Sequence, residues 1–458
     1  MNSPEIAPTP SVARRASLAG FFGTAVEAYD FMVFTFLIAY LSPLFFPSDN
    51  PTAGVLSTLA VLGTGFLARP IGGIVFGRIG DRYGRRFALI VTISGMGGAT
   101  ILMGLLPTHA TVGILAPVLL VLTRMLQGFF AGGEQMGSAT FVAEHASAKN
   151  YGILSAMTPV GFAFGGALAP LAVALTTSLT SEETMANWGW RIPLLMSLPL
   201  MLYVLFLRKR LEESPDFQEL AGAHKVQSSP VRSVVTRYPA TLLRVIALST
   251  SVLAIGYVVP AYMPLFLQQQ VDMAPGVTAW IATAGSTFAV VIGFGAGFLI
   301  DRAGRRNTMV IGLGIILVTM FPIMYFMKAT GGNLIVTAGG HMLLVGLAGA
   351  SAVPVYATLT SAFPAAIRYT GAAIGFGLGS AIGGGLGPYL AGKFTAITGN
   401  PYAASGVVGA AALLGIVVIA TMPNSNSSAA PEASLITGDA ESVDADPVEE
   451  PAPAPKMV

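Results

Sequence analysis

Twelve long apolar segments, separated by short polar ones, occupy the chain from residue 18 to residue 422. An apolar stretch of about 20 residues is long enough to cross a bilayer as a helix, and a helix satisfies its own backbone hydrogen bonds there. We therefore expect an all-α integral membrane protein with twelve transmembrane helices. The expected helices cover residues 18–46, 53–77, 87–107, 113–143, 151–178, 191–207, 241–270, 277–300, 307–327, 334–361, 370–392 and 403–422.

The composition supports this reading and excludes several other classes of protein. Only 10% of the 458 residues are charged, whereas a soluble domain carries about 25%. The absence of cysteine excludes a disulfide framework, a thiolate metal site and a cysteine nucleophile. Four scattered histidines make no metal site, and no set of nucleophile, base and orienting residue is recognisable. We expect no enzyme activity, no metal, no cofactor and no binding of nucleic acid.

Lysine and arginine orient the expected helices in the membrane. If both termini are cytoplasmic, the inside segments hold nineteen basic residues, Arg208 among them, and the outside loops hold only Lys328 and Lys393, with Arg191 at a membrane edge. The positive-inside rule then places both termini in the cytoplasm. The first sixteen residues are polar and lack a cleavage site, so we expect no removable signal peptide. The expected location is the plasma membrane.

An internal repeat divides the chain into two halves. The sequence GRIGDRYGRR (77–86) follows the second expected helix, and GFLIDRAGRR (297–306) follows the eighth. Two pseudo-symmetric six-helix bundles are typical of transporters that rock about a central site. We expect a cytoplasmic N-terminal segment (1–17), a first bundle (18–207), a cytoplasmic loop (208–240), a second bundle (241–422) and a disordered acidic cytoplasmic tail (423–458).

The paired DRxGRR loops resemble those of the major facilitator superfamily. The phrases RPIGG (69–73), RMLQGFFAGGE (124–134), WGWRIP (188–193), LEESPDF (211–217) and FPAAIRYTG (363–371) resemble the metabolite:proton symporter family within it. The resemblance implies the major facilitator fold and import of a metabolite such as α-ketoglutarate, citrate, shikimate, proline or betaine.

Three positions depart from the family pattern. Ala28 stands where the first helix of the family usually has tryptophan, and Ser361 stands where the family often has glutamate. Residues 423–458 lack the heptads of the osmosensing members, which counts against an osmolyte carrier.

Five ionisable residues lie within the expected helices, and all of them are in the first half. A charge at this depth costs at least about 2.5 kcal/mol and needs a partner or a wet cavity. These residues are Glu27, Asp30, Arg69, Arg124 and Glu134. In the second half, only His341 offers an alternative proton site.

Roles follow from charge and from helical spacing. Glu27 and Asp30 are neighbours on one helix face, and Arg124, Gln127 and Glu134 share a face of another helix. We expect Arg124 and Arg69 to bind an anionic substrate together with Gln127 and Tyr29. We expect Glu27, Asp30 or Glu134 to carry the proton. The alternative for each residue is an ion pair that only locks helices together.

The two repeated loops are expected to act as a gate on the cytoplasmic side, because the same order of residues recurs in both halves. The alternative is a basic patch that only sets topology. The resemblance adds Glu144 and Arg368. The expected gating residues are Gly77, Asp81, Arg82, Gly84, Arg85, Arg86, Glu144, Asp301, Arg302, Arg305 and Arg368.

These features together predict a proton-coupled symporter that takes up a small polar metabolite, most simply an organic acid, by alternating access. A zwitterion such as proline or betaine is the alternative substrate, since Glu27 and Asp30 would offset its cationic end. A non-transporting membrane receptor is a remote alternative without support in the sequence. The expected partners are the substrate, protons and membrane lipid, and the chain is expected to act as a monomer.

Overall fold

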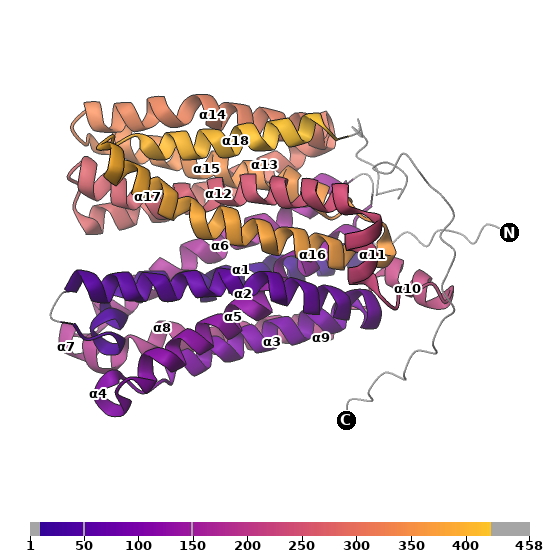
Figure 1. Cartoon of the computed structure of the whole chain (residues 1–458), viewed down its shortest axis with the longest axis horizontal. Helices are drawn as coiled ribbons and strands as arrows, with labels where there is room; N and C mark the ends of the chain where they lie inside the picture. The colour runs from indigo at the N-terminus through magenta and orange to yellow at the C-terminus, as the bar shows by residue number, and fades with distance from the viewer. Residues whose placement is uncertain (1–9, 49–50, 148–149, 423–458) are drawn as a thin grey trace.

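The computed structural model describes residues 10–48, 51–147 and 150–422, and this part of the chain is helical without strands (Figure 1). Within it, eleven helices are long and apolar enough to cross a membrane. The remaining expected span, 370–392, runs through three shorter helical segments joined end to end. The prediction of an all-α membrane protein is confirmed. The acidic tail, predicted to be disordered, lies outside the described residues.

The first half of the chain forms one group of helices, coloured indigo to magenta in Figure 1. Its long helices are α1 (Pro10–Phe45), α2 (Pro51–Tyr83), α3 (Arg85–Gly104), α5 (Leu115–Glu144), α6 (Tyr151–Leu179) and α9 (Ser197–Lys209). Its short ones are α4 (His109–Val112), α7 (Glu182–Thr184), the π-helical turn η2 (Met185–Gly189) and α8 (Arg191–Leu195).

The second half forms the other group, coloured pink to yellow. Its members are α12 (Pro239–Gln270), α13 (Pro275–Ala303), α14 (Arg305–Ala329), α15 (Leu334–Leu359), the 3-10 turn η3 (Ala365–Ile367), α16 (Arg368–Gly379), the π-helical η4 (Ser380–Leu386), α17 (Gly387–Thr398) and α18 (Ala403–Ala420). Two short helices in the linker, α10 (Pro215–Gly222) and α11 (Pro230–Arg237), join the groups. The segment expected as a loop therefore contains helical structure.

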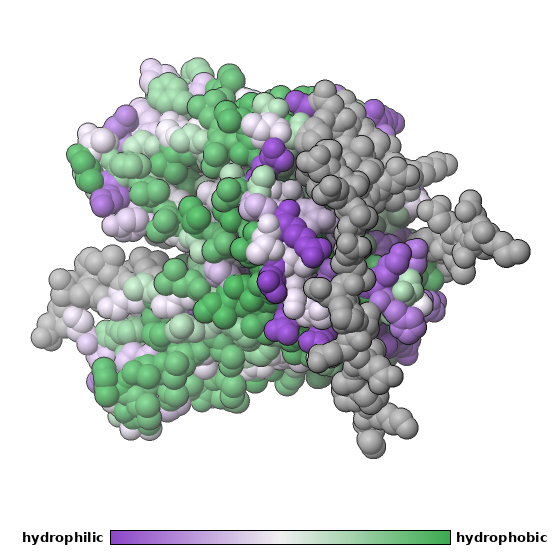
Figure 2. Space-filling view, turned by 45° about the vertical axis from the view of Figure 1, so that its right-hand side comes forward, coloured by the Kyte–Doolittle hydropathy of each residue, from purple (hydrophilic) through white to green (hydrophobic). Residues whose placement is uncertain are grey.

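The two ends of the molecule differ in charge. We call the end with α10, α11 and the DRxGRR turns the basic end, and the end with α4 and α7 the opposite end (Figure 1). Figure 2 shows hydrophobic residues over the flanks of the helices and hydrophilic residues gathered at the basic end. Such an apolar flank suits contact with lipid.

The two halves meet through a few helices. Helix α2 packs against α16 and η4, and α6 packs against α13 and α15. Within the first half, α2 and α5 approach closely because a Cβ at Gly72 would lie 1.7 Å from the carbonyl oxygen of Phe129, and one at Gly128 would lie 2.0 Å from that of Gly65. Small residues allow this backbone contact in a membrane. The close approach brings Arg69 of α2 and Arg124 of α5 together.

Candidate functional site

A cluster of buried charges lies between α1, α2 and α5. We call Glu27, Asp30, Arg69, Arg124 and Gln127 the central cluster. Both guanidinium groups lie against Phe31 of α1, with their central carbons 4.7 Å (Arg69) and 3.9 Å (Arg124) from the ring centroid. The two arginines are 1% and 0% exposed. The structure therefore brings together two cations that the sequence places 55 residues apart, 69 and 124.

Arg69 lies at the boundary between the halves. Its Nη1 donates to the Ser380 hydroxyl of η4 over 3.4 Å, and its Nη2 is 3.5 Å from the Glu27 carboxylate. Its Nε and Nη2 make no hydrogen bond. A buried guanidinium normally has partners for its five N–H groups, so these donors of Arg69 are an exception in the described structure.

Arg124 is held more deeply in the first half. It donates to Gln127 on the next turn of α5 and, over 3.2 Å, to the carbonyl of Phe31. The Gln127 amide in turn donates to the Asp30 carbonyl (3.0 Å) and to the Thr100 hydroxyl (2.8 Å). Gln127 therefore fixes the orientation of Arg124, while the Arg124 Nε has no partner.

The two acids of α1 are completely buried. Neither carboxylate oxygen of Glu27 accepts a hydrogen bond, and its one charged neighbour within 4 Å is Arg69. The Asp30 oxygens lie beside the Ser197 and Thr100 hydroxyls without a formed hydrogen bond. Buried polar atoms without partners are uncommon and point to function when they gather in one place.

Two residues expected in the site are engaged elsewhere. The Tyr29 hydroxyl donates to the Pro193 carbonyl of α8 over 2.6 Å, within an apolar cluster that includes Trp190. Glu134 forms a closed ion pair with Arg208 and also accepts from the Thr92 hydroxyl over 2.5 Å. His341, on α15, is buried, and its ring lies against Gly285 of α13, where a Cβ would lie 3.0 Å from the His341 Cδ2.

The structure corrects the expected position of Arg208, which was counted among the basic residues of the cytoplasmic segments. It was expected in a cytoplasmic segment, but it is 1% exposed and its guanidinium reaches into the bundle. The guanidinium of Arg208 fits against α1 because Gly23 lacks a side chain: a Cβ there would lie 2.1 Å from Arg208 Nη2. A charge imbalance in the sequence, three buried acids against two arginines, signals that a further cation is needed.

The second half contributes aromatic residues that the sequence did not single out. Tyr257 of α12 packs edge-on against Phe66, with ring centroids 5.1 Å apart, and its buried hydroxyl lies beside Arg69 without a formed hydrogen bond. Tyr356 of α15 is also buried and lies within electrostatic reach of Glu27. Tyrosines in apolar helices are too common for a sequence pattern to mark these two.

At the basic end, each half caps a helix of the other half. Asp81, at the end of α2, accepts from the backbone N–H groups of Tyr369 (3.3 Å) and Thr370 (2.8 Å) in the first turn of α16. Asp301, at the end of α13, accepts from those of Gly152 (2.7 Å) and Ile153 (3.2 Å) in the first turn of α6. Carboxylates stabilise helix N-termini, so both contacts hold the halves together.

The glycines of the repeated loops permit this approach. A Cβ at Gly77 would lie 2.7 Å from the Thr370 Cα. Gly84 and Gly304 have φ of 104° and 80° and form the one-residue turns after α2 and α13. A side chain is disfavoured at these positive φ values.

An ion network lies beneath these caps, and we call it the gate network. Arg85 is 3.2 Å from both Asp81 and Glu144, and Glu144 is 3.1 Å from Arg368 of the second half. Arg368 also contacts Asp216 of α10 over 2.5 Å. The structure thus assembles four of the expected gating residues and adds Asp216, which stands in the linker motif LEESPDF.

The remaining expected gating arginines make other contacts. Arg305 donates to the Ser361 hydroxyl over 2.5 Å, the place where a glutamate would give an ion pair. Arg86 donates to the Lys209 carbonyl over 2.6 Å. Arg82 is half-buried and stacks on Tyr83, whereas Arg302 is exposed, so these two are not part of the network.

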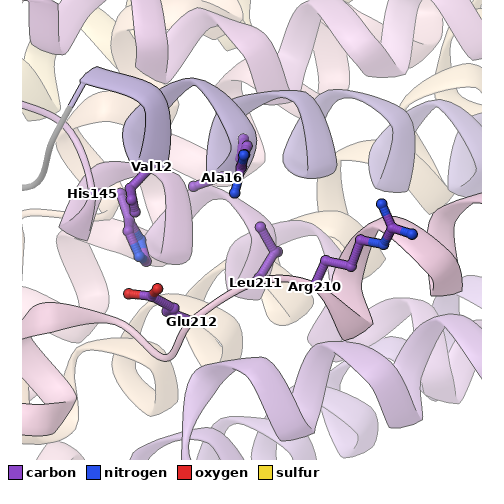
Figure 3. Close-up of a pocket in the computed structure, with 7 residues that line it drawn as sticks. Val12, Ala16, His145, Arg210, Leu211 and Glu212 are labelled. Atoms are coloured by element: carbon purple, nitrogen blue, oxygen red, sulfur yellow. The ribbon is translucent and has the colours of Figure 1, made fainter.

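Glu213 holds the linker against the first half beside the gate network. Glu213 accepts from the N–H groups of Arg85 (2.9 Å) and Arg86 (3.1 Å), and burial raises its pKa. Its neighbour Glu212 lies next to the His145 ring in a pocket of about 20 Å³ (Figure 3). Burial lowers the pKa of His145. This pocket has room for about one water molecule, so it is a structural contact.

Replacing Asp81 by asparagine is expected to open the basic end, because the amide loses one acceptor and opposes the N–H groups of α16 with its own. A lost charge-assisted bond of about 1–3 kcal/mol corresponds to a shift of at least about fivefold in the ratio of closed to open molecules. The chain has no cysteine, so spin labels at exposed Tyr83 and Asn307 can report the distance between the halves. An unchanged distance distribution would contradict the gating role of Asp81. Asp272→Asn, at the opposite end, is the matched control.

The closed state is also expected to depend on pH through Asp216. Burial and the neighbouring Glu144 raise the pKa of Asp216 while it contacts Arg368. An Asp216 that is solvated when the basic end opens returns to an ordinary pKa of about 3.9. The closed state therefore binds the proton more tightly, and its population rises as pH falls through the raised pKa and levels off below the ordinary one. The same labels should show this trend, and Asp216→Asn should flatten it; a trend that persists in this variant would assign it to another group.

Comparison with known proteins agrees with the fold. Residues 20–376 and 263–441 match the Major Facilitator Superfamily, two overlapping matches that together span most of the chain. The chain belongs to the Major Facilitator Superfamily.

Relatives in this superfamily are transporters rather than enzymes. The chain is 32% identical over 414 residues to a putative proline/betaine transporter of Staphylococcus aureus, covering 89% of this chain and 87% of the relative. It is 34% identical over 396 residues to the shikimate transporter of Escherichia coli, covering 85% of this chain and 90% of that transporter. A solved proton:xylose symporter has the same fold, with a TM-score of 0.75 and 18% sequence identity. The match covers 90% of this chain and 95% of the symporter. The protein is therefore a multi-pass membrane transporter, and the suspected family is confirmed.

Proposed function

We propose that this transporter carries a small organic acid into the cell together with a proton. The observation that carries the proposal is the pair of buried arginines on Phe31, which retain N–H donors without hydrogen-bond partners; Arg69 of this pair lies at the boundary between the halves. Two guanidinium groups suit a carboxylate, since each offers a planar fork of donors. The shikimate transporter among the relatives supports an acid as substrate.

Glu27 provides the coupling in this proposal. Its carboxylate is 3.5 Å from Arg69 and accepts no hydrogen bond, so an anionic Glu27 competes with an anionic substrate for the same guanidinium. Protonation of Glu27 removes this competitor and frees Arg69 for the substrate. The empty carrier returns after Glu27 has released the proton and paired again with Arg69. Binding of proton and acid is thereby linked, as symport requires.

Glu134 is the less suitable proton carrier. Its carboxylate is neutralised by Arg208 and receives hydroxyl donors, so both of its oxygens have partners. We assign it the structural role of an ion pair between α5 and α9. Asp30 remains a second acid that can exchange a proton, since its oxygens lack formed hydrogen bonds.

A zwitterion such as proline or betaine is the second candidate substrate, and the names of two relatives favour it. A quaternary ammonium is usually bound by a cage of aromatic rings. Here the faces of Phe31 and Phe66 are occupied by the chain's own arginines. This geometry favours the acid.

We further propose that the basic end faces the cytoplasm, with both termini on that side of the plasma membrane, because basic loops are retained there. The proposed reaction needs no cofactor or metal, and the proton is the coupling ion. One chain contains a complete central cluster, which is consistent with a functional monomer surrounded by lipid.

Uptake into proteoliposomes tests this function. The full chain is reconstituted and offered labelled shikimate, α-ketoglutarate, citrate, proline and betaine, with an inward proton gradient imposed or collapsed by a protonophore. We expect accumulation of at least one acid, and loss of that accumulation with the protonophore. Uptake that ignores the gradient would identify a uniporter, and accumulation of proline or betaine alone would replace the acid as substrate.

A further inference from the structure

A groove at the basic end lies apart from the central cluster and from the gate network. It has a volume of about 370 Å³ and runs between α2 and α11. Its lining residues are Arg78, Ser229, Pro230, Val231, Arg232, Val235 and Thr236. This size is within the range of small-molecule sites in proteins.

Two arginines face this groove without acidic partners. Among the residues that the structure describes, neither Arg78 nor Arg232 takes part in an ion pair, and no carboxylate lines the groove. Both side chains are exposed. Two neighbouring like charges without a counterion favour the binding of an anion.

One face of α2 leads from this groove along the apolar flank of the molecule. Leu67, Ile71 and Ile74 are 69%, 59% and 41% exposed. Together with Arg78 they form a series with successive spacings of four, three and four residues. Such a spacing places all of them on one side of a helix. At 1.5 Å per residue the stripe is about 16 Å long, which is about half the thickness of the hydrocarbon core.

Helix α11 completes the site from the other side. Its Val235 is 52% exposed beside the groove, whereas Val234 is buried against the protein. A short helix with basic and apolar faces suits the membrane interface. The ligand that matches all these features has an anionic head and a long apolar chain.

We propose that this groove binds an anionic phospholipid, with Arg78 and Arg232 on its phosphate and an acyl chain along the exposed stripe of α2. The apolar stripe favours a lipid over the chain's own acidic tail, since the tail is composed mainly of Ala, Ser, Pro, Asp and Glu. Helix α11 also packs against α16 and η3. A lipid that joins α2 to α11 therefore ties the first half to the linker beside the gate network and stabilises the closed basic end.

Lipid binding by the purified full chain in a neutral detergent tests the proposal. Dioleoyl phosphatidylglycerol, dioleoyl phosphatidylcholine and glycerol 3-phosphate are titrated while bound lipid is counted by native mass spectrometry and the Tm is followed. We expect one saturable site for phosphatidylglycerol with a raised Tm, weaker binding of phosphatidylcholine, and no shift with glycerol 3-phosphate. An equal effect of glycerol 3-phosphate would show that the site takes free phosphate and would overturn the lipid.

Variants separate this site from general attraction to a basic surface. Arg78→Gln with Arg232→Gln should weaken phosphatidylglycerol binding about thirtyfold, since each basic residue near an anionic lipid contributes about 1 kcal/mol, or about fivefold in affinity. The lysine pair, R78K with R232K, keeps both charges and should stay within about threefold. Arg237→Gln, on α11 but outside the groove, is the matched control and should stay within about twofold.

Two further results would overturn the proposal. If the glutamine pair binds as tightly as the control variant, then lipid attaches elsewhere. If phosphatidylglycerol binds only after residues 424–458 are deleted, then the acidic tail is the occupant of the groove. The exposed position of both arginines makes the variants foldable, and the unchanged Tm of each lipid-free variant verifies this.

Discussion

Substitution of Arg69 by alanine is expected to abolish binding of the transported acid. The side chain is the one member of the central cluster that bonds to the second half, through Ser380, and it carries unused donors. Loss of one partner from a buried charged pair costs about 2–5 kcal/mol, which corresponds to a loss of affinity of at least about thirtyfold. Lysine should restore little, because its point charge cannot replace a planar fork. Counterflow of the acid identified by the uptake panel measures this affinity.

A matched control distinguishes this effect from general damage. Arg191 belongs to the same half and is held at the opposite end by the carbonyls of Asn187 and Leu106. Arg191→Lys should bind the acid within about twofold of the unmodified chain, whereas Arg69→Lys should not. Normal affinity in Arg69→Ala would move the anion to Arg124, which lies on the same aromatic ring.

The fold could be predicted from the sequence because the bilayer restricts which backbone structures can cross it. Backbone groups must be satisfied within each span, so the apolar segments predict helices with little ambiguity. The repeated loops also carry their own geometry: a glycine at positive φ and an aspartate at the end of a helix recur at Gly84 and Gly304, and at Asp81 and Asp301. These features depend on local chemistry, which a sequence pattern records.

The missed residues depend instead on side-chain direction and on the partner half. Arg208 follows the last apolar residue of its span, and a count of charges by segment assigns it to the loop; its long side chain nevertheless extends back to Glu134. Asp216 acquires its place from the way α10 folds under Arg368. Tyr257 faces Arg69 only because the two halves pack in this register. No periodicity within one helix determines such contacts.

Replacement of Glu27 by glutamine is expected to uncouple transport from the proton gradient. Glutamine resembles a permanently protonated acid in shape and charge, so Arg69 stays free for the substrate and exchange across the membrane continues. Accumulation should vanish, because no proton is bound and released in each cycle. With one proton per acid, a gradient of one pH unit supports about tenfold accumulation by the original chain, against none by the variant. Counterflow and gradient-driven uptake, measured in the same liposomes, separate the two effects.

Two further amide variants decide whether this effect belongs to Glu27. Glu134→Gln leaves Arg208 buried without its anion, a loss of about 3–5 kcal/mol. We therefore expect a lower Tm and less inserted protein, with coupling retained in what inserts. Asp30→Asn tests the second free acid, which is not paired with an arginine. If Glu27→Gln still accumulates substrate and Asp30→Asn does not, the proton binds beside Thr100 and Ser197, and the competition for Arg69 is not the coupling step.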